Sequence, residues 1–383
     1  MTRLVEPRGE IHWSPGYRRD DQDASVWFDA LGEQVTDPEV LGRLAKLAIP
    51  PAWNHVWAAP NPEDRVQARG VDARGRTQYR YSPAATEEAA RYKFAHMLHY
   101  ASVLPRLREL IEMRLSEPIE APDFRQVTAL AGRFLDRGLF RVGSDRYVKD
   151  NNTYGLTTLR TSHVSVAGDT VTFDYVGKEH LRQYHEIEDP LAARLTSRLL
   201  ELNSLVEYRD PGPYLFSVPD PLPEPPFTAE PAELQHAELQ AAVASRPRRR
   251  VRAATLNSYI HAATGAPATA KMARTWGGTV IAAAVAGGAR FESLKKHRDP
   301  SLTAFDAAAA VLGNTPTMAR SSYVHPAALS VGASEPVRSA VEAAASARGT
   351  DDVRKLFFDS DLQEAVRLAL VEQTQGNPSG ERA

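Results

Sequence analysis

The sequence of 383 residues contains no cysteine, which excludes disulfide bonds and metal sites built from thiolates. It also lacks an apolar run long enough to span a membrane. The first residues, "MTRLVEPRGEIHWSPGYRRDD", do not include the apolar segment that a secretion signal requires. We therefore expect a cytoplasmic protein that has no membrane partner.

Signatures of nucleotide and metal sites are missing as well. "GVDARGRT" (70–77) has the glycine spacing of a phosphate-binding loop, but Arg76 replaces the lysine and a strand-like segment follows where a helix is required. "HLRQYHEIED" (180–189) contains two histidines without the His-Glu-x-x-His spacing of a zinc site. We predict no metal, no nucleotide and no other cofactor.

Net charge is small and lysine is scarce. The chain has a net charge of −2, and only eight of its 46 basic residues are lysine, so the overall balance does not predict nucleic-acid binding. Arginine is nevertheless concentrated in two runs, "RVQARGVDARGRTQYR" (65–80) and "RPRRRVR" (246–252). A solvated charged face accounts for most such runs, so these two favour a polyanionic partner only modestly.

The length and a hydrophobic content of 43% fit a globular protein of two domains. Residues 1–85 are rich in proline, tryptophan, glycine and charge, with short apolar alternations that predict a small β-rich domain. Helical periodicity dominates residues 86–383, which predicts a larger, mainly α-helical domain. The predicted class is α+β, with later helices near 190–204, 253–264, 268–286, 302–312 and 351–372.

Three segments of the second domain depart from the helical pattern. "HVSVAGDTVTFDYVGKEHLRQYHEI" alternates apolar and polar residues and predicts a small three-stranded β-patch, with turns at 167–169 and 177–179. The stretch 218–250 is rich in proline and glutamate and ends in the second arginine run, which predicts a surface insertion. Residues 373–383 are predicted to be a flexible tail.

Tyr323 lies in "LGNTPTMARSSYVHP" (312–326), on a predicted short helix that begins at Asn314-Thr315-Pro316. A tyrosine on a short helix is most often a half-buried packing residue. The rest of the chain offers three further motifs in a fixed order. These are "LFRVGSDRY" with Arg141, "YVGKEH" with Lys178, and "KMARTWGGT" with Lys271 and Arg274.

The ordered set Arg, Lys, Arg, Asn, Tyr resembles that of the type IB DNA topoisomerases, specifically the small poxvirus-like and bacterial enzymes. The resemblance runs from about Ile49 to His325. The family signatures R-[IV]-G, G-K-[DE], R-T-[YW]-G and L/V-G-[HN]-T-P…Y are all present. "IPPAW" and "GVDARGRTQYRY" also look like the family's small β domain, whose Q-Y-x-Y strand enters the DNA major groove.

This resemblance implies the catalytic fold that tyrosine recombinases and type IB topoisomerases share. It implies relaxation of supercoiled double-stranded DNA, without ATP or metal, by single-strand cleavage, strand rotation and religation. It further implies a monomer that clamps around the duplex and is associated with the nucleoid. The implied catalytic residues are Arg141, Lys178, Arg274, Asn314 and Tyr323, and the implied DNA-contact residues are Arg76, Gln78, Tyr79, Tyr81, Tyr147 and Lys271.

The chemistry explains why these residue types are needed. Cleavage of a phosphodiester passes through a phosphorane with extra negative charge, which two permanently charged arginines stabilise. A tyrosine nucleophile forms a 3′-phosphotyrosyl ester whose phenol leaves readily, with a pKa of about 10, so resealing needs no ATP. The departing 5′-oxygen needs a proton, which a lysine gives up far more readily than an arginine does.

Other interpretations stay open. Taken singly, Arg141 fits a helix-end surface arginine, Lys178 an ordinary hairpin charge, and Tyr79 with Tyr81 an aromatic edge pair. A tyrosine recombinase is the strongest alternative, although such enzymes usually have His-x-x-Arg where this chain has Lys271-Met272-Ala273-Arg274. The third alternative is a catalytically idle DNA-binding relative. Most poxvirus-type enzymes have histidine at the position of Asn314.

Overall fold

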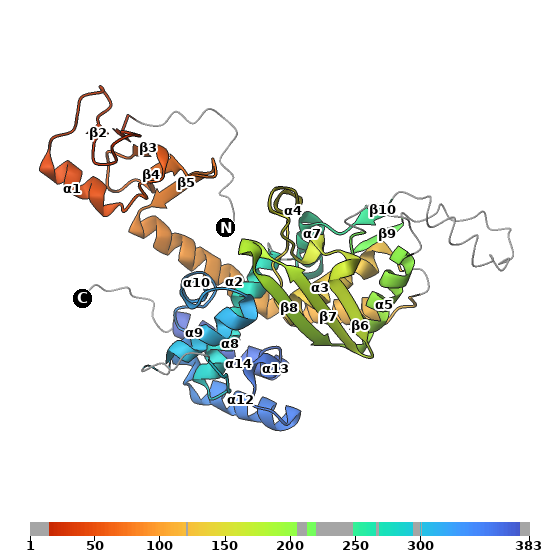
Figure 1. Ribbon diagram of the computed structural model, residues 1–383. Coiled ribbons are helices and arrows are strands. Elements are labelled where there is room, and N and C mark those ends of the chain that lie inside the picture. Colours follow the sequence, from red (N-terminus) through yellow and green to blue (C-terminus); the bar gives the residue numbers. More distant parts are fainter. Residues whose placement is uncertain are drawn as a thin grey trace. The chain divides into compact units, whose positions relative to one another are not determined.

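The computed structural model describes residues 15–119, 122–204, 213–219, 248–265, 268–293, 299 and 301–375 (Figure 1). The chain divides into two compact units, Met1–Lys93 and Phe94–Ala383. The division falls inside the long helix α2 (Pro83–Leu115), which begins in the first unit and continues into the second. Among the described residues, no helix is both long and apolar enough to cross a membrane.

The first unit contains a five-stranded antiparallel sheet and one further helix, which confirms the predicted N-terminal β-structure. The strands lie in the order β2-β1-β3-β4-β5. Trp27, Leu44, Val56, Ala58 and Ala68 form its buried core. The elements are β1 Tyr17–Arg19, β2 Trp27–Phe28, α1 Pro38–Lys46, β3 Asn54–Ala58, β4 Val66–Val71 and β5 Thr77–Tyr81.

The "GVDARGRT" segment turns the chain from β4 into β5 as a β-hairpin. A strand follows it, as the sequence predicted, whereas a phosphate-binding loop opens a helix. The turn is closed by a hydrogen bond from the Gly75 amide to the Asp72 carbonyl, 2.9 Å, with Gly75 in the left-handed region at φ +70°. The Asp72 carboxylate accepts hydrogen bonds from the backbone amides of Arg74 and Arg76. The side chain of one residue thus fixes the conformation of the turn.

The second unit combines helices with a three-stranded antiparallel sheet of β6 (Val164–Ala167), β7 (Thr170–Val176) and β8 (Arg182–Glu188). This confirms the predicted β-patch and both of its turns. Residues opposite each other on β7 and β8 include Val171 with Ile187 and Phe173 with His185. Helices α3 (Phe124–Gly138) and α5 (Pro190–Ser204) pack against this sheet (Figure 1).

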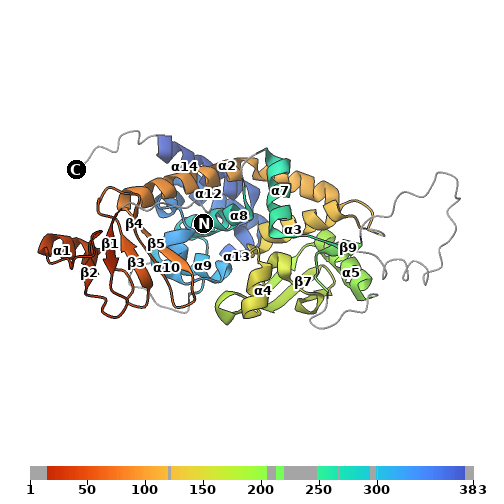
Figure 2. The ribbon, with the colours of Figure 1, turned by 90° about the horizontal axis from the view of Figure 1, so that it is seen from above.

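Helix α8 is the centre of the second unit, and helices contact it from several sides (Figure 2). It is buried almost all round because its sequence is rich in alanine and glycine, which lets neighbouring helices approach closely. The helices are α3 Phe124–Gly138, α4 Asp145–Asn151, α5 Pro190–Ser204, α7 Ala253–Thr264, α8 Ala270–Ala286, α9 Ser301–Leu312, α10 Pro316–Ser322, α11 Ala328–Gly332, α12 Glu335–Arg348, α13 Val353–Leu356 and α14 Ser360–Gln375. Short 3₁₀ turns span Leu156–Thr158, Thr161–His163 and Lys178–His180.

The C-terminal prediction of one helix over 351–372 is wrong, because the chain breaks between α13 and α14. Helix α13 ends at Leu356 with Phe357 as its C-cap. Asp359 caps the start of α14 and accepts hydrogen bonds from the amides of Asp361 and Leu362 at 3.1 Å. Helix α14 continues to Gln375, so the first residues of the predicted tail are helical. Residues 376–383 lie outside the described part of the chain.

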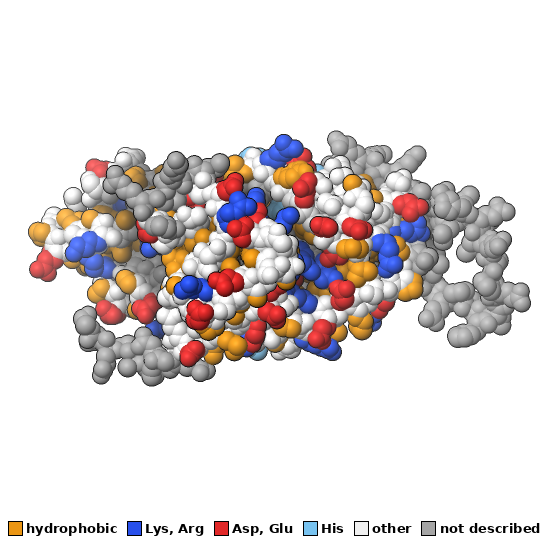
Figure 3. All heavy atoms as spheres, turned by 90° about the horizontal axis from the view of Figure 1, so that it is seen from below, with side chains coloured by type: hydrophobic (Ala, Val, Ile, Leu, Met, Phe, Trp, Pro, Cys, Tyr) orange, Lys and Arg blue, Asp and Glu red, His pale blue; other side chains and the backbone are white. Residues whose placement is uncertain are grey.

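The arginine run in 246–252 is largely used within the fold. Residues 248–250 form strand β10 (Arg248–Arg250), which pairs with β9 (Ser217–Pro219) at the other end of the predicted insertion, while residues 220–247 lie outside the described residues. Arg249 stacks on Phe124 and Arg250 pairs with the Asp145 carboxylate at 2.7 Å. On the face drawn in Figure 3, basic and acidic side chains are interspersed, in keeping with the small net charge.

Candidate active site

Four segments of the second unit meet around Tyr323. They are the chain leaving α3, helix α8, the turn between α9 and α10, and the end of α10. Helix α3 ends at Gly138, and Leu139 adopts the left-handed conformation (φ 49°) that turns the chain toward Arg141. Thr315 caps the start of α10, where its hydroxyl accepts a hydrogen bond from the Met318 amide, and Pro316 follows as the first helical residue.

Arg141 reaches across to the turn between α9 and α10. Its Nη2 donates to the carbonyl of Gly313 at 2.6 Å and to Oδ1 of Asn314 at 2.5 Å. The guanidinium group of Arg141 therefore binds two residues that follow it by 172 and 173 positions in the sequence. The predicted first arginine and asparagine are neighbours in space.

Arg274 is buried, with 4% of its surface exposed. Its guanidinium donates to the carbonyls of Leu139 and Leu312, which ties the end of α3 to the end of α9. Burial lowers the pKa of Arg274 to about 10, so the group stays charged near neutral pH. Its Cζ lies 5.2 Å from the centre of the Tyr323 ring.

Tyr323 is the residue directly after α10, whereas the sequence predicted it to lie on the helix itself. Its carbonyl accepts a hydrogen bond from the Thr279 hydroxyl at 3.3 Å. Gly278 of α8 lies against the tyrosine: a Cβ atom on this glycine would be in van der Waals contact with Cβ of Tyr323 at 3.4 Å and would crowd Cδ1 of Leu312 at 3.0 Å. The tyrosine is half-buried against the arginine cluster.

The electrostatics of the cluster act on the Tyr323 phenol in opposite directions. Burial would raise the pKa of Tyr323, but Arg274, Arg141 and Lys271 together outweigh burial and hold that pKa below its ordinary value. A lower pKa gives a larger fraction of phenolate at neutral pH. This is the change that a phenol needs to become a nucleophile.

Asn314 has one half of its amide engaged and the other half unused. Arginine can only donate hydrogen bonds, so the amide oxygen must face Arg141 and the amide nitrogen must face away. That Nδ2 is buried and has no hydrogen-bond partner among the described residues. Buried donors are nearly always paired in folded proteins, so this donor indicates a missing acceptor.

Lys178 is not part of this cluster in the structure. It lies at the tip between β7 and β8 with 60% of its side chain exposed, and its Nζ is 3.6 Å from Oε1 of Glu179. Lys271, in contrast, is near enough to Tyr323 to lower the pKa of the phenol. The structure therefore brings four of the five predicted catalytic residues together, with Lys271 beside them.

His185 also belongs to the surroundings of the site, although the sequence analysis did not single it out. Its ring lies 4.3 Å from that of Phe140, the residue before Arg141. Burial, then Arg274 and Arg141, lower the pKa of His185 to about 4, so its imidazole is neutral under physiological conditions. The alternation in "RQYHEIE" could have placed it inward, opposite Phe173.

The predicted DNA-contact residues of the first unit lie on the β4–β5 hairpin. The rings of Tyr79 and Tyr81 are stacked with centroids 6.0 Å apart, which confirms that they share one face of the strand. Arg76 and Gln78 both donate to the Asp72 carboxylate, at 2.8 and 2.9 Å. The hydrogen bonds from Arg76, more than any other contact, hold the pKa of Asp72 below its usual range.

Tyr147, the predicted DNA contact of the second unit, lies on α4 with 54% of its surface exposed. Arg250 fixes the start of this short helix, because its Nη2 donates to both carboxylate oxygens of Asp145 at 2.7 Å. The sequence analysis did not predict α4. Its anchoring by the arginine run gives that run a structural use next to a predicted contact residue.

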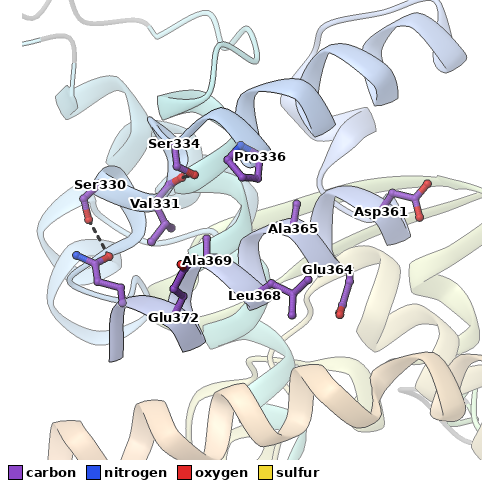
Figure 4. Close-up of a pocket in the computed structure, with 11 residues that line it drawn as sticks. Ser330, Val331, Ser334, Pro336, Asp361, Glu364, Ala365, Leu368, Ala369 and Glu372 are labelled. Carbon is purple, nitrogen blue, oxygen red and sulfur yellow. Dashed lines mark hydrogen bonds between the residues drawn. The ribbon is translucent and has the colours of Figure 1, made fainter. Parts of the chain in front are cut away.

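Two other observations bear on what the structure can bind. A groove of about 720 Å³ lies along α14, with acidic side chains from that helix and no basic residue in its lining (Figure 4). It shares no residue with the Tyr323 cluster and does not suit a phosphate. Within the described ranges, no group of three or more His, Asp or Glu side chains could hold a metal ion.

Comparisons with known proteins agree with the resemblance. The profile of the family described as "Eukaryotic DNA topoisomerase I, catalytic core" matches residues 82–334, about two thirds of the chain. The profile "Bacterial DNA topoisomerase IB, N-terminal domain" matches residues 26–72. The first match includes every residue of the Tyr323 cluster.

Viral proteins are among its relatives. DNA topoisomerase 1B of Acanthamoeba polyphaga mimivirus is 29% identical over 181 residues, which are 47% of this chain and 53% of that protein. DNA topoisomerase 1B of Vaccinia virus (strain Copenhagen) is 26% identical over 150 residues, 39% of this chain and 45% of that protein. The chain thus spans about half the length of these relatives.

The catalytic-core profile covers well over half of the sequence and includes the tyrosine and both arginines. The chain belongs to the DNA topoisomerase I family, as a member of type IB. Residues 26–72 of its N-terminal unit are similar to the N-terminal domain of bacterial DNA topoisomerase IB.

Proposed function

We propose that this protein relaxes supercoiled duplex DNA by transient cleavage of one strand. The observation that supports this most strongly is the convergence of Arg141, Arg274 and Asn314 around a tyrosine whose pKa is held below its ordinary value by cations. A DNA-binding scaffold alone needs no activated phenol. The proposed function includes no ATP and no metal step.

In the proposed cleavage step, the Tyr323 phenol loses its proton to water, and the phenolate oxygen attacks the phosphorus of one phosphodiester. The new bond joins the phenol oxygen to phosphorus, and the bond from phosphorus to the 5′-oxygen breaks. Arg141 and Arg274 hold the non-bridging oxygens as negative charge accumulates there. Asn314 donates its unused Nδ2–H to one of the same oxygens.

The departing 5′-oxygen takes its proton from Lys178 in this proposal. The lysine lies on an exposed turn, so the turn meets the phosphodiester only when duplex DNA is bound. After the free 5′ strand has rotated, the 5′-hydroxyl returns its proton and attacks the phosphotyrosine. The Tyr323 phenolate leaves and regains a proton from water, so the strand is whole again and atoms and electrons balance over the cycle.

The DNA-contact residues belong to the same proposal. Tyr79 and Tyr81 present stacked rings on one face of a strand, which suits insertion into a groove. Arg76, Gln78, Tyr147 and Lys271 would bind phosphates or base edges along the duplex. The two units would close around the duplex as a monomeric clamp, which also accounts for an association with the nucleoid.

Plasmid relaxation in EDTA and without ATP tests the function. The wild-type protein should relax supercoiled plasmid and form a covalent adduct with DNA. Tyr323→Phe should lose both while keeping duplex affinity within a few fold, because only the attacking oxygen is removed. Supercoils that persist across protein and salt titrations would refute the proposal, and an adduct in Tyr323→Phe would assign the nucleophile to another residue.

A tyrosine recombinase remains the second candidate because it would use the same cluster. The two functions differ in their products. A topoisomerase reseals the same strand and yields relaxed plasmid as a ladder of topoisomers, whereas a recombinase joins strands of two duplexes. Joined products from a mixture of two marked duplexes would favour the recombinase.

A further inference from the structure

Gln183 lies on the inner face of β8, between the core of the second unit and the turn that bears Lys178. Opposite pairs on the hairpin are Phe173 with His185 and Tyr175 with Gln183. Because side chains alternate along a strand, Gln183 shares its face with His185, which contacts Phe140. Gln183 is therefore the next inward residue toward the tip.

Two glycines leave the space that the Gln183 side chain fills. A Cβ atom on Gly313 would lie 2.5 Å from Oε1 of Gln183, and a Cβ atom on Gly177 would lie 2.6 Å from its Cγ. Both distances are too short for real atoms. Gly177 belongs to the Lys178 turn, and Gly313 precedes Asn314, so one side chain lies against both sides of the site.

The two glycines differ in why they are needed. Gly313 has φ +59°, a conformation that favours glycine on its own account. Gly177 has φ −94°, which any residue adopts, so its missing side chain matters only for the room it gives Gln183. The same imagined Cβ on Gly313 lies 3.4 Å from Nη1 of Arg141, which places the Gln183 amide beside the arginine cluster.

Packing at the tip itself is sparse. Val176 and Leu181 on either side of it are exposed, at 41% and 53%. The tip is closed by the hydrogen bond from the Gly177 amide to the Leu181 carbonyl, 2.8 Å, which holds the turn but not its distance from Tyr323. At the base of the turn, the Gln183 side chain lies against Gly313.

We propose that Gln183 is a positioning residue that holds the β7–β8 hairpin against the Gly313–Asn314 turn, so that Lys178 meets the departing 5′-oxygen. This inference rests on the proposed function, in which Lys178 is the general acid. Gln183 touches no reacting atom. It acts through the lysine, and misplacement of a catalytic group by about 1 Å is enough to slow a reaction by roughly 10²-fold.

Single-turnover cleavage of two matched duplexes tests this inference. One duplex has the normal 5′-bridging oxygen, and the other has sulfur at that position, which leaves as a thiolate and needs little help from an acid. Gln183→Ala should cleave the oxygen duplex roughly 10–10²-fold more slowly and the sulfur duplex at nearly the wild-type rate. The double variant Gln183→Ala with Lys178→Ala should be no slower than Lys178→Ala alone.

Two further variants guard against a general loss of folding. Tyr184→Ala changes the neighbouring exposed residue on the opposite face of β8, and it should cleave both duplexes like the wild type. Gln183→Met keeps the length of the side chain and should restore most of the rate if filling the space between the glycines is what matters. Melting temperatures of all variants show whether any of them is destabilised.

The possible outcomes separate the inference from the function on which it rests. If Lys178→Ala is rescued by sulfur but Gln183→Ala is slowed equally on both duplexes, or if slowing is additive in the double variant, the role of Gln183 is overturned. If Lys178→Ala itself gains nothing from sulfur, the proposed acid is wrong. In that case the double variant still shows whether Gln183 acts through Lys178. Non-additive slowing on the oxygen duplex supports this, and additive slowing overturns it.

Discussion

The Nδ2–H donor of Asn314, which is unpaired within the described part of the chain, can be tested by a variant that changes this one atom and should slow DNA cleavage. Asn314→Asp replaces the amide nitrogen with oxygen and leaves the shape of the side chain unchanged. The new carboxylate still faces Arg141, which donates to this side chain at 2.5 Å. The position that offered N–H to a phosphate oxygen then presents a negative charge instead.

The magnitude follows from two effects. Loss of one preorganised donor to a charged transition state costs about 10²–10³ in rate, which is the effect expected for Asn314→Ala. In Asn314→Asp, a carboxylate about 4 Å from a phosphate charge adds a repulsion of about 4 kcal/mol at an effective dielectric constant of about 20. Pairing with Arg141 offsets part of this, but it also draws the guanidinium away from the phosphate. Asn314→Asp should therefore be slower than Asn314→Ala by a further factor of roughly 10–10².

Stability should change in the opposite direction to activity. The carboxylate forms an ion pair with Arg141, so the melting temperature of Asn314→Asp should equal or exceed that of the wild type. Asn314→Ala removes the acceptor of that guanidinium and should be slightly less stable. A variant that is folded, more stable and less active separates a catalytic effect from a structural one.

The assay is single-turnover formation of the covalent adduct with protein in excess over a labelled duplex. Asn314→His serves as the matched variant that restores a donor, and it should cleave faster than Asn314→Ala. Two results would refute the reasoning. One is cleavage by Asn314→Ala within about threefold of wild type, and the other is cleavage by Asn314→Asp as fast as by Asn314→Ala.

Three shorter predictions follow from the surroundings of the site. Lys271→Gln removes a cation that lowers the pKa of Tyr323, so the pH–rate profile of cleavage should move to higher pH; an unmoved profile would exclude this electrostatic role. The pKa of His185 is about 4 in the folded protein and 6.5 when free, so the unfolded chain binds a proton at a higher pH than the folded one. The free energy of unfolding should therefore fall by about 2–3 kcal/mol as the pH falls from 6.5 to 4. His185→Phe should flatten that part of the stability curve in denaturant titrations, and an equally steep curve would show that the histidine is not buried as a neutral group. Replacing Gln78, Tyr79 and Tyr81 of the β4–β5 hairpin with alanine should change the footprint and the cleavage sites on DNA more than the cleavage rate of bound complexes. An unchanged footprint would count against DNA contact by these three side chains.

The sequence predicted well those features that depend on local patterns. The β-patch and its turns followed from alternation and from Gly168 and Gly177, and both appear at the predicted positions. The start of α10 followed from a polar cap and Pro316. Helix ends without such signals were missed, and the break before α14 depends on Asp359, one of many aspartates that could cap a helix.

The arrangement of the site was beyond local patterns. The motifs named Arg141, Arg274, Asn314 and Tyr323 in order, but not the hydrogen bonds that join them. Arg274 binds two backbone carbonyls at the ends of α3 and α9, and no side-chain pattern reveals such partners. The lowered pKa of the tyrosine depends on distances that only the folded chain fixes.

A comparison of Lys178 with Gln183 shows where motif-based prediction ends. A motif identifies the residue that is proposed to perform the chemistry, and Lys178 could be named from the three letters of G-K-[DE]. The residue that sets its position is found only through the space left by two glycines, one of which has a backbone conformation open to any residue. Because an exposed turn has no packing of its own to fix it, the precision of the proposed proton transfer must come from the base of the hairpin. In this proposal the general acid Lys178 and the side chain of Gln183 beneath it act as one unit, although only the lysine has a signature in the sequence.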